Sequence, residues 1–178
     1  MTNQNQLRLA VIGTSGSGKS TLAAAAARKL GIKHIEQDQL FWLPKWQMIP
    51  RDQFAEAVQK EISVDSWTIC GNHSFLQEQI WERATHVVWL NYSLTTCLGR
   101  GFLRTIRRVF LREECCNGNR EGFRHAFMSK NSILWWILTT HKSRGEQYRQ
   151  AQRLGKFCNA QFLEFKRPVE ADKWFRDL

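Results

Sequence analysis

The feature that most constrains this chain is a glycine-rich segment near its N-terminus. Residues 13–20 read GTSGSGKS, which matches the pattern G-x-x-x-x-G-K-S. Glycines allow the backbone to wrap closely around a phosphate group, with successive N–H groups pointing inward. In such a loop the lysine, here Lys19, reaches the β- and γ-phosphates of a nucleoside triphosphate, and the hydroxyl of Ser20 binds Mg²⁺. The pattern therefore predicts a site for ATP and Mg²⁺.

The sequence on either side of this loop favours that interpretation over an ordinary Gly/Ser turn. A short apolar run of strand type, residues 7–12, precedes the loop, and the helix-forming alanines 23–27 follow it. A helix that begins at the loop adds the positive end of its dipole to an anion site. The residues predicted to hold the phosphates are Gly13, Ser15, Gly16, Ser17, Gly18, Lys19, Ser20 and Thr21.

The composition is that of an ordinary globular protein. The length suits one domain with a hydrophobic core, so we expect residues 1–178 to form a single domain. No apolar run approaches a membrane span, and the polar N-terminal residues do not resemble a signal peptide. The five cysteines form no C-x-x-C pair, so we expect reduced thiols in a cytoplasmic protein. A zinc site at Cys115, Cys116 and His125 is an alternative, but its spacing matches no common ligand pattern.

The net charge of +10 is concentrated in one stretch of the chain. Residues 100–156 contain thirteen Lys and Arg against four Asp and Glu, whereas residues 1–99 contain nine against eight. A basic block of this kind binds phosphate groups, either on a small molecule or on a nucleic acid. The charge pattern leaves both kinds of partner open.

Short strand-like runs alternate with helical patterns along the chain. We expect strands at 7–12, 33–36, 67–70, 86–90 and 160–165, with helices between them that include 94–112, 131–142 and 146–154. This alternation predicts an α/β fold with a mostly parallel sheet and helices on both faces. Ligands of such sheets bind at the carboxyl ends of the strands.

Several polar residues directly follow these strands, and Asp38 is the most informative of them. A carboxylate beside a phosphate loop can orient and deprotonate an acceptor hydroxyl, or hold Mg²⁺ through water. The simpler alternative is a solvated turn residue or a helix cap. Gly71 and Asn72 are candidates for contacting the acceptor, and Lys166 and Arg167 for contacting the nucleotide.

The segment after Asp38 is rich in aromatic residues. Two interpretations fit Phe41, Trp42 and Trp46. One is that they line an acceptor pocket, and the other, equally good for at least two of them, is that they pack beneath a loop. His73, His125 and His141 belong to no motif, so we expect structural or exposed roles for them.

The expected helix 94–112 carries Arg100, Arg104, Arg107 and Arg108 on one face. No acidic residue between 97 and 111 lies at helical spacing to neutralise them. The alternative is an amphipathic helix with solvated arginines and an opposite apolar face of Leu98, Phe102, Ile106 and Val109. Arg suits bidentate phosphate contacts. We therefore expect this helix to form the first part of a basic lid that spans about residues 100–145.

The chain resembles the adenylate-kinase-related P-loop kinases in four segments. These are the glycine loop, DQLFW at 38–42, WTICGN at 67–72 and the strand VVWL at 87–90. The resemblance is closest to the bacterial subgroup labelled DNA topology modulation protein. It implies a P-loop nucleoside triphosphate hydrolase fold with a five-stranded parallel sheet in the order 2-3-1-4-5 and an arginine lid. The chain departs from the family pattern at Cys70 and Asn91, where relatives carry Asp, and both departures remove acidic groups from the expected Mg²⁺ site.

Two functions from different classes follow from these features. The first is an ATP-dependent phosphotransferase that acts on a nucleotide, a nucleoside or another small hydroxylated acceptor, and the second is an ATP-responsive nucleic-acid-binding protein. In the first, acceptor contacts come from Asp38, Phe41, Trp42, Gly71 and Asn72, and metal contacts from Ser20 and Asp38. The residues predicted to act in phosphoryl transfer are Lys19, Asp38, Arg100, Arg104, Arg107 and Arg108.

Overall fold

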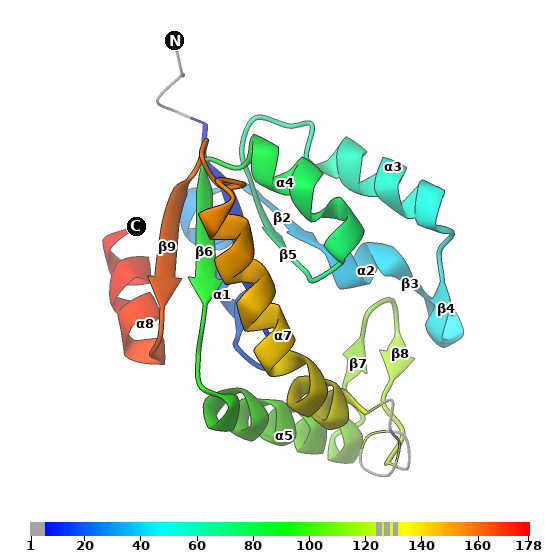
Figure 1. Cartoon of the computed structure of the whole chain (residues 1–178). Coiled ribbons are helices and arrows are strands. Elements are labelled where there is room, and N and C mark those ends of the chain that lie inside the picture. The colour runs from blue at the N-terminus through cyan, green and yellow to red at the C-terminus, as the bar shows by residue number, and fades with distance from the viewer. Residues whose placement is uncertain (1–5, 124–125, 127–128, 130–131) are drawn as a thin grey trace.

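The computed structural model describes residues 6–123, 126, 129 and 132–178, and it is built on a five-stranded parallel sheet (Figure 1). The strands lie in the order β2-β5-β1-β6-β9. Their bounds are Lys33–Glu36, Trp67–Cys70, Arg8–Gly13, His86–Leu90 and Gln161–Phe165. Since these are the second, third, first, fourth and fifth strands of this sheet along the chain, the predicted order 2-3-1-4-5 is confirmed, and so is the α/β class.

The sheet is buried on both faces, as near-continuous apolar strands require. Alternate residues of β1 face opposite sides, so Leu9 and Val11 pack in one cluster and Ala10 and Ile12 in another. Helices α1 (Lys19–Leu30) and α8 (Pro168–Asp177) contribute to the first cluster. The second is covered by α3 (Arg51–Glu61), α4 (Gln77–Arg83) and α7 (Ile133–Arg153) (Figure 1).

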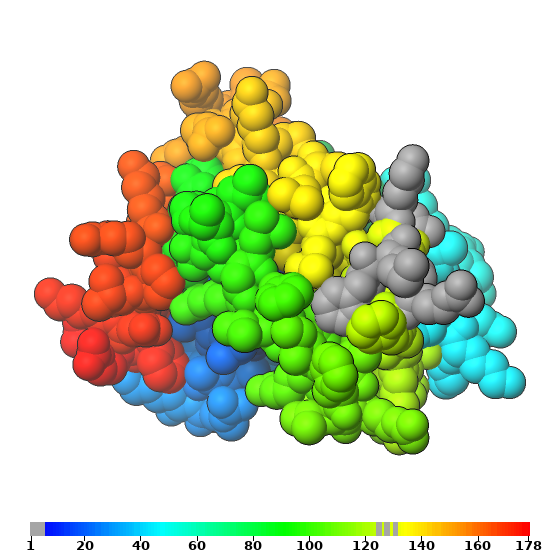
Figure 2. All heavy atoms as spheres, turned by 90° about the horizontal axis from the view of Figure 1, so that it is seen from below, coloured from blue at the N-terminus to red at the C-terminus, as the bar shows by residue number. Residues whose placement is uncertain are grey.

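Helix α5 (Leu94–Phe110) lies across the carboxyl edge of the sheet, and its residues occupy the middle of the face in Figure 2. The glycine loop approaches its backbone so closely that a side chain at Gly16 would collide with the carbonyl oxygen of Cys97. The buried stripe of α5 is therefore made of small residues, Cys97, Gly101 and Thr105. The apolar face expected from the sequence is not the buried one, and Phe102 is 45% exposed.

Helix α7 is one continuous helix where the sequence pattern predicts two. Gly145 lies near its middle, and a glycine there costs about 1 kcal/mol of helix stability relative to alanine. Ile137 and Tyr148, on either side of that glycine, are both fully buried. Their burial on the same helix keeps it continuous through the weak position.

Two short hairpins interrupt the α/β pattern and contact each other beside the sheet. The first joins β3 (Trp42–Leu43) to β4 (Gln47–Met48), and the second joins β7 (Glu114–Cys115) to β8 (Asn119–Arg120). Asn117 donates to the carbonyls of Gln39 and Trp42, and Asn119 donates to the carbonyl of Leu43, at distances of 2.7–2.9 Å. These hydrogen bonds connect Asn117 and Asn119, which belong to the expected lid, to the aromatic segment. Arg124, His125 and Lys130 lie outside the described residues.

Among the helices that the structure describes, none has the length and apolar character that crossing a membrane demands.

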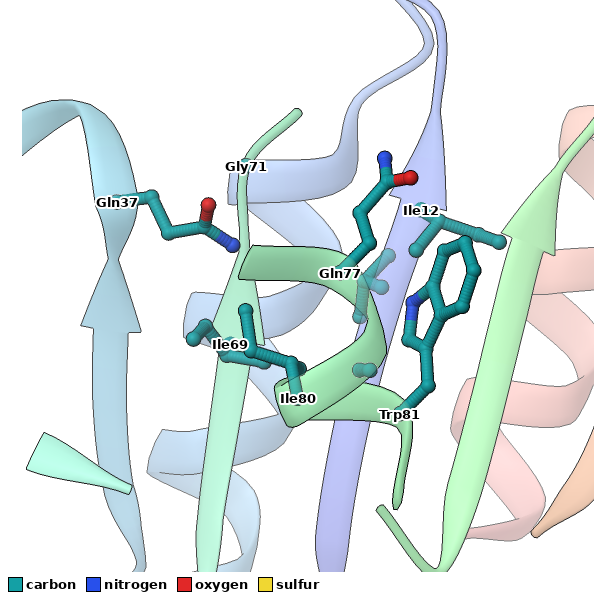
Figure 3. A pocket seen from close by; sticks show the side chains of 9 residues that line it. Ile12, Gln37, Ile69, Gly71, Gln77, Ile80 and Trp81 are labelled. Atoms are coloured by element: carbon teal, nitrogen blue, oxygen red, sulfur yellow. The ribbon is translucent and has the colours of Figure 1, made fainter. Parts of the chain in front are cut away.

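The end of β5 packs against helix α2 (Gln37–Phe41) by means of a glycine. Figure 3 shows Gln37 and Gln77 on either side of this strand end, lining a small cavity of about 10 Å³. Gly71 has a φ of 147°, and a Cβ atom there would lie 2.5 Å from Cβ of Gln37. The missing side chain at position 71 therefore makes room for Gln37 as well as permitting the sharp turn after the strand.

We expect the substitution Gly71→Ala to lower the free energy of unfolding by about 1–3 kcal/mol, because it adds both backbone strain and overpacking. Gly99→Ala is the matched control, since Gly99 lies within helix α5 with nothing near its would-be Cβ. That change should raise the free energy of unfolding by about 0.5–1 kcal/mol. Urea denaturation of both variants measures the two signs, and an unchanged midpoint for Gly71→Ala would contradict the packing described.

Candidate active site

The glycine loop connects β1 to α1 and has the backbone shape of an anion cradle. Gly16 and Gly18 adopt left-handed conformations, with φ values of 81° and 95°. Gly18 is the N-cap of α1 and has no side chain to satisfy the first N–H groups of the helix. Those groups are consequently available to an anion bound at the loop, with the helix dipole in support.

Lys19 lies over this loop and is almost completely buried. Its Nζ donates to the carbonyl oxygen of Thr14 at 2.9 Å, and the residue is 9% exposed. Burial lowers the pKa of its ammonium group from 10.5 to about 8, although the charge of Asp38 opposes that change. A desolvated ammonium held by one carbonyl is suited to binding a more negative partner such as a phosphate.

Ser20 lies beside the end of β5, in the position expected for a metal-binding hydroxyl. Its Oγ accepts from the Sγ of Cys70 at 3.5 Å, and Cys70 is 2% exposed. Burial raises the pKa of this thiol to about 12, so it remains neutral near pH 7. Mg²⁺ prefers oxygen ligands, and the thiol does not supply one.

Asn91 does not compensate for the missing carboxylate at Cys70. Its Nδ2 donates to Oε1 of Glu164 at 2.7 Å, and its backbone N–H donates to the carbonyl of Phe165. The residue therefore ties the end of β6 to β9. In the described part of the chain, no group of three or more His, Cys, Asp and Glu side chains is arranged to hold a metal ion. His125 of the alternative zinc set lies outside that part.

Asp38 lies in α2 at the same edge, with about half of its side chain exposed. Its Oδ1 is 3.3 Å from Nε2 of His73. Burial favours the neutral acid, but the hydrogen bond from His73 and the charges of His73, Lys19 and Arg104 outweigh it and lower the pKa of Asp38. Asp38 is therefore an ionised carboxylate near neutral pH, within electrostatic reach of the lysine of the loop.

An open groove of about 470 Å³ is lined in part by His73, the hydrogen-bond partner of Asp38. Phe41 is the one predicted acceptor residue that lines it, together with Met48, Ile49, Arg51, His73, Ser74 and Phe75. The guanidinium of Arg51 lies 4.2 Å from the centroid of the Phe75 ring, so the groove combines a cation with apolar side chains and the polar His73 and Ser74. Arg51 and Phe75 belong to no sequence motif, and only the approach of α3 to the end of β5 reveals them.

The other aromatic residues of this segment pack on each other. The rings of Trp42 and Trp46 are 5.5 Å apart, and Trp42 also contacts Phe41 at 5.0 Å. The backbone N–H of Trp46 donates to Oδ1 of Asn119, and its Nε1 donates to the carbonyl of Arg120. Both tryptophans therefore connect the two hairpins.

The four arginines of α5 have different surroundings. Arg100 donates to the carbonyl of Ser17 at 3.1 Å, against the loop. Arg104 is half-buried, its Nε has no hydrogen-bond partner among the described residues, and its charge acts on both Lys19 and Asp38. Arg107 and Arg108 pair with Glu113 and Glu121 at 2.9 and 2.8 Å. These carboxylates come from beyond the helix, which is why a search at helical spacing does not find them.

The remaining predicted residues lie at the carboxyl ends of their strands but are engaged in structural contacts. Asn72 accepts from the hydroxyl of Tyr148 through Oδ1 and from Arg144 through its carbonyl, both at 3.0 Å. The backbone N–H groups of Lys166 and Arg167 donate to Glu170, which caps α8. These two residues follow the edge strand β9, with β6 between it and β1.

The comparisons with known proteins bear on the fold. No protein-family model matches the chain, and no curated protein does. Similar solved structures include a shikimate kinase from Acinetobacter baumannii in complex with shikimate, with 14% identity, a TM-score of 0.59 and coverage of 98% of this chain and 91% of that one. A shikimate kinase from Bacteroides thetaiotaomicron has 17% identity, a TM-score of 0.55 and coverage of 97% and 95%. A gluconokinase from Sinorhizobium meliloti 1021 has 19% identity, a TM-score of 0.52 and coverage of 98% and 90%.

At these identities the similarity shows a shared fold, an α/β arrangement around a parallel sheet, which is the class of fold that the sequence predicts. The matches do not bear on the narrower resemblance to DNA topology modulation proteins.

We expect Cys70→Asp to strengthen Mg²⁺ binding and to cost folding stability. A carboxylate beside Ser20 adds an oxygen ligand and a negative charge, and even a tenfold lower Mg²⁺ requirement needs only about 1.4 kcal/mol. Burying that charge without metal should lower the free energy of unfolding by about 1–3 kcal/mol. Thermal melting with and without Mg²⁺–ATP measures both effects, and Cys70→Ser is the neutral control. Equal Mg²⁺ responses of the two variants would show that position 70 is not at the metal.

Proposed function

We propose that the protein transfers the γ-phosphoryl group of Mg²⁺–ATP to a hydroxyl of a small acceptor. The observation that supports this most strongly is the meeting of Lys19, Asp38 and Arg104 at one edge of the sheet, where both cations act on the carboxylate. Phosphoryl transfer relies on positioning and charge stabilisation, and these three groups supply a phosphate-binding ammonium, a candidate base and a further cation.

Each group has a defined part in the proposed reaction. The loop N–H groups and Lys19 bind the β- and γ-phosphates, and the hydroxyl of Ser20 offers a hard oxygen donor that fits Mg²⁺. When bound, the metal neutralises phosphate charge. Asp38 takes the proton of the acceptor hydroxyl. The oxygen of that hydroxyl forms a bond to the γ-phosphorus, and the bond between the γ-phosphorus and the leaving oxygen of ADP breaks. Arg104, with Arg100 against the loop, stabilises the transferred charge.

The groove beside Asp38 is the proposed acceptor site. Its apolar lining and the cation of Arg51 suit a small acceptor that has an apolar or planar face and an anionic group. Nucleotides and hydroxylated acids meet that description in full, and nucleosides supply the planar face without the anionic group. The similar structures named as shikimate kinase and gluconokinase support a small-molecule kinase in general and leave the acceptor of this chain open.

The alternative is ATP-responsive nucleic-acid binding through residues 100–156, as the resemblance to DNA topology modulation proteins suggests. The structure offers it less support, because Arg107 and Arg108 are paired with carboxylates, so their charges are already partly compensated. The two hypotheses differ in what substitutions of these arginines should change.

We expect Asp38→Asn to lower turnover by about 10²-fold or more while ATP affinity changes little, because the amide keeps the shape but cannot accept the proton. The measurement is ADP formation with a panel of nucleosides, nucleotides and small hydroxylated acids, alongside calorimetry of ATP binding. If acceptor-dependent turnover survives within a few-fold, Asp38 is a turn residue, and if no acceptor stimulates the wild type, the proposed function fails.

We expect Arg104→Ala to lower turnover by about 10²-fold, as for loss of a charge-stabilising donor. Arg107→Ala is the matched control on the same helix, because exposed ion pairs such as Arg107–Glu113 contribute only about 0–1 kcal/mol. If the protein instead binds nucleic acid through this region, each substitution should weaken DNA binding evenly and reduce the salt slope by about one unit. Steady-state kinetics and DNA titrations at several salt concentrations on the same variants decide between the two.

A further inference from the structure

His73 and Asp38 are brought together by the pairing of two neighbouring strands. Glu36, the last residue of β2, lies opposite Cys70, the last residue of β5. Asp38 and His73 follow those partners by two and three residues, so both leave the sheet at the same edge. The contact of Gln37 with Gly71 holds the two segments together immediately before the Asp38–His73 hydrogen bond.

The imidazole of His73 is held in place by rings on two sides. Its centroid lies 4.5 Å from that of Phe41 and 4.7 Å from that of Phe54, and the side chain is 18% exposed. Asp38, by contrast, has 52% of its side chain exposed. The histidine is therefore the more buried member of the pair and lines the groove, and the carboxylate is the member more open to a ligand from outside.

The direction of the hydrogen bond follows from the charge of the carboxylate. An ionised carboxylate has no proton to donate, so Nε2 of His73 must carry the hydrogen that lies between them. Both the Nε2–H tautomer of neutral histidine and the imidazolium ion have this hydrogen. The bond occupies Oδ1 and leaves Oδ2 outside this interaction.

We infer that His73 is a positioning residue of the proposed phosphoryl transfer, which fixes Asp38 through Oδ1 so that Oδ2 can accept the proton of the acceptor hydroxyl. This role rests on the proposed function, and it requires the N–H donor of the ring rather than its charge. Lys19 and Arg104 also act on Asp38, but as more distant charges, and neither is within hydrogen-bond distance of it. His73 is the one hydrogen-bond partner of the Asp38 side chain among the described residues.

The test compares His73→Leu with His73→Gln in the full-length protein. Leucine keeps apolar contact with Phe41 and Phe54 but has no donor, whereas the amide of glutamine places an N–H group near the former Nε2. For His73→Leu we expect kcat to fall about tenfold or more with ATP affinity little changed, whereas acceptor KM can change as well because His73 lines the groove. His73→Gln should recover most of that loss. His86→Leu is the control, because His86 begins β6 at the opposite end of the sheet.

Asp38→Asn completes the set, and the double variant Asp38→Asn/His73→Leu should be no slower than Asp38→Asn alone, because both changes remove the same function. The inference is overturned if His73→Leu keeps the wild-type kcat, if leucine and glutamine are equally slow, or if the two losses multiply. A wild type without acceptor-dependent turnover, or an Asp38→Asn variant that keeps it, would instead overturn the proposed function on which the inference rests. Melting curves of each variant separate these outcomes from loss of folding.

Discussion

The parallel pairing of β2, β5 and β1 is the constraint on which the candidate site depends. Cys70 lies opposite both Val11 and Glu36, so the three chain segments leave the sheet at nearly the same level. A parallel strand cannot return to its neighbour through a tight turn, and each segment therefore continues outward from the carboxyl edge before it crosses back. The glycine loop, Asp38 and His73 belong to these three exits, and for that reason they meet although they are distant in the sequence.

Positive charge exceeds negative charge at this edge of the sheet, and the excess determines which kind of ligand the edge favours. Lys19 and Arg104 both act on Asp38, whereas the thiol of Cys70 remains neutral because burial raises its pKa. The amide of Asn91 is engaged with Glu164. A site with this excess of positive charge favours a multiply charged anion such as a triphosphate. It offers a divalent metal few protein oxygens, so in the proposed reaction much of the coordination would come from the phosphates of ATP.

The acceptor side depends on two hairpins that are too short to be stable alone. Asn117 and Asn119 of the β7–β8 hairpin bind the backbone of the aromatic segment, and Lys45 and Trp46 within that segment have positive φ values of 61° and 56°. Such conformations are costly and persist only where surrounding contacts enforce them. The same region follows α5 in the chain, and Arg100 of α5 donates to the carbonyl of Ser17 in the glycine loop, so this helix connects the hairpins with the proposed phosphate site.

Local patterns, and the family resemblance that they carry, are enough to predict the glycine loop, the five strands and the order of the parallel sheet. They also predict that Lys19, Ser20 and Asp38 lie at one edge. The groups around these residues depend on how the chain packs: His73 contacts Asp38, Glu113 and Glu121 pair with two of the arginines, and α7 continues through Gly145. The small-residue stripe of α5 is a further case, since the glycine loop packs there. These features depend on distances between remote segments, which neither helical spacing nor residue propensity encodes.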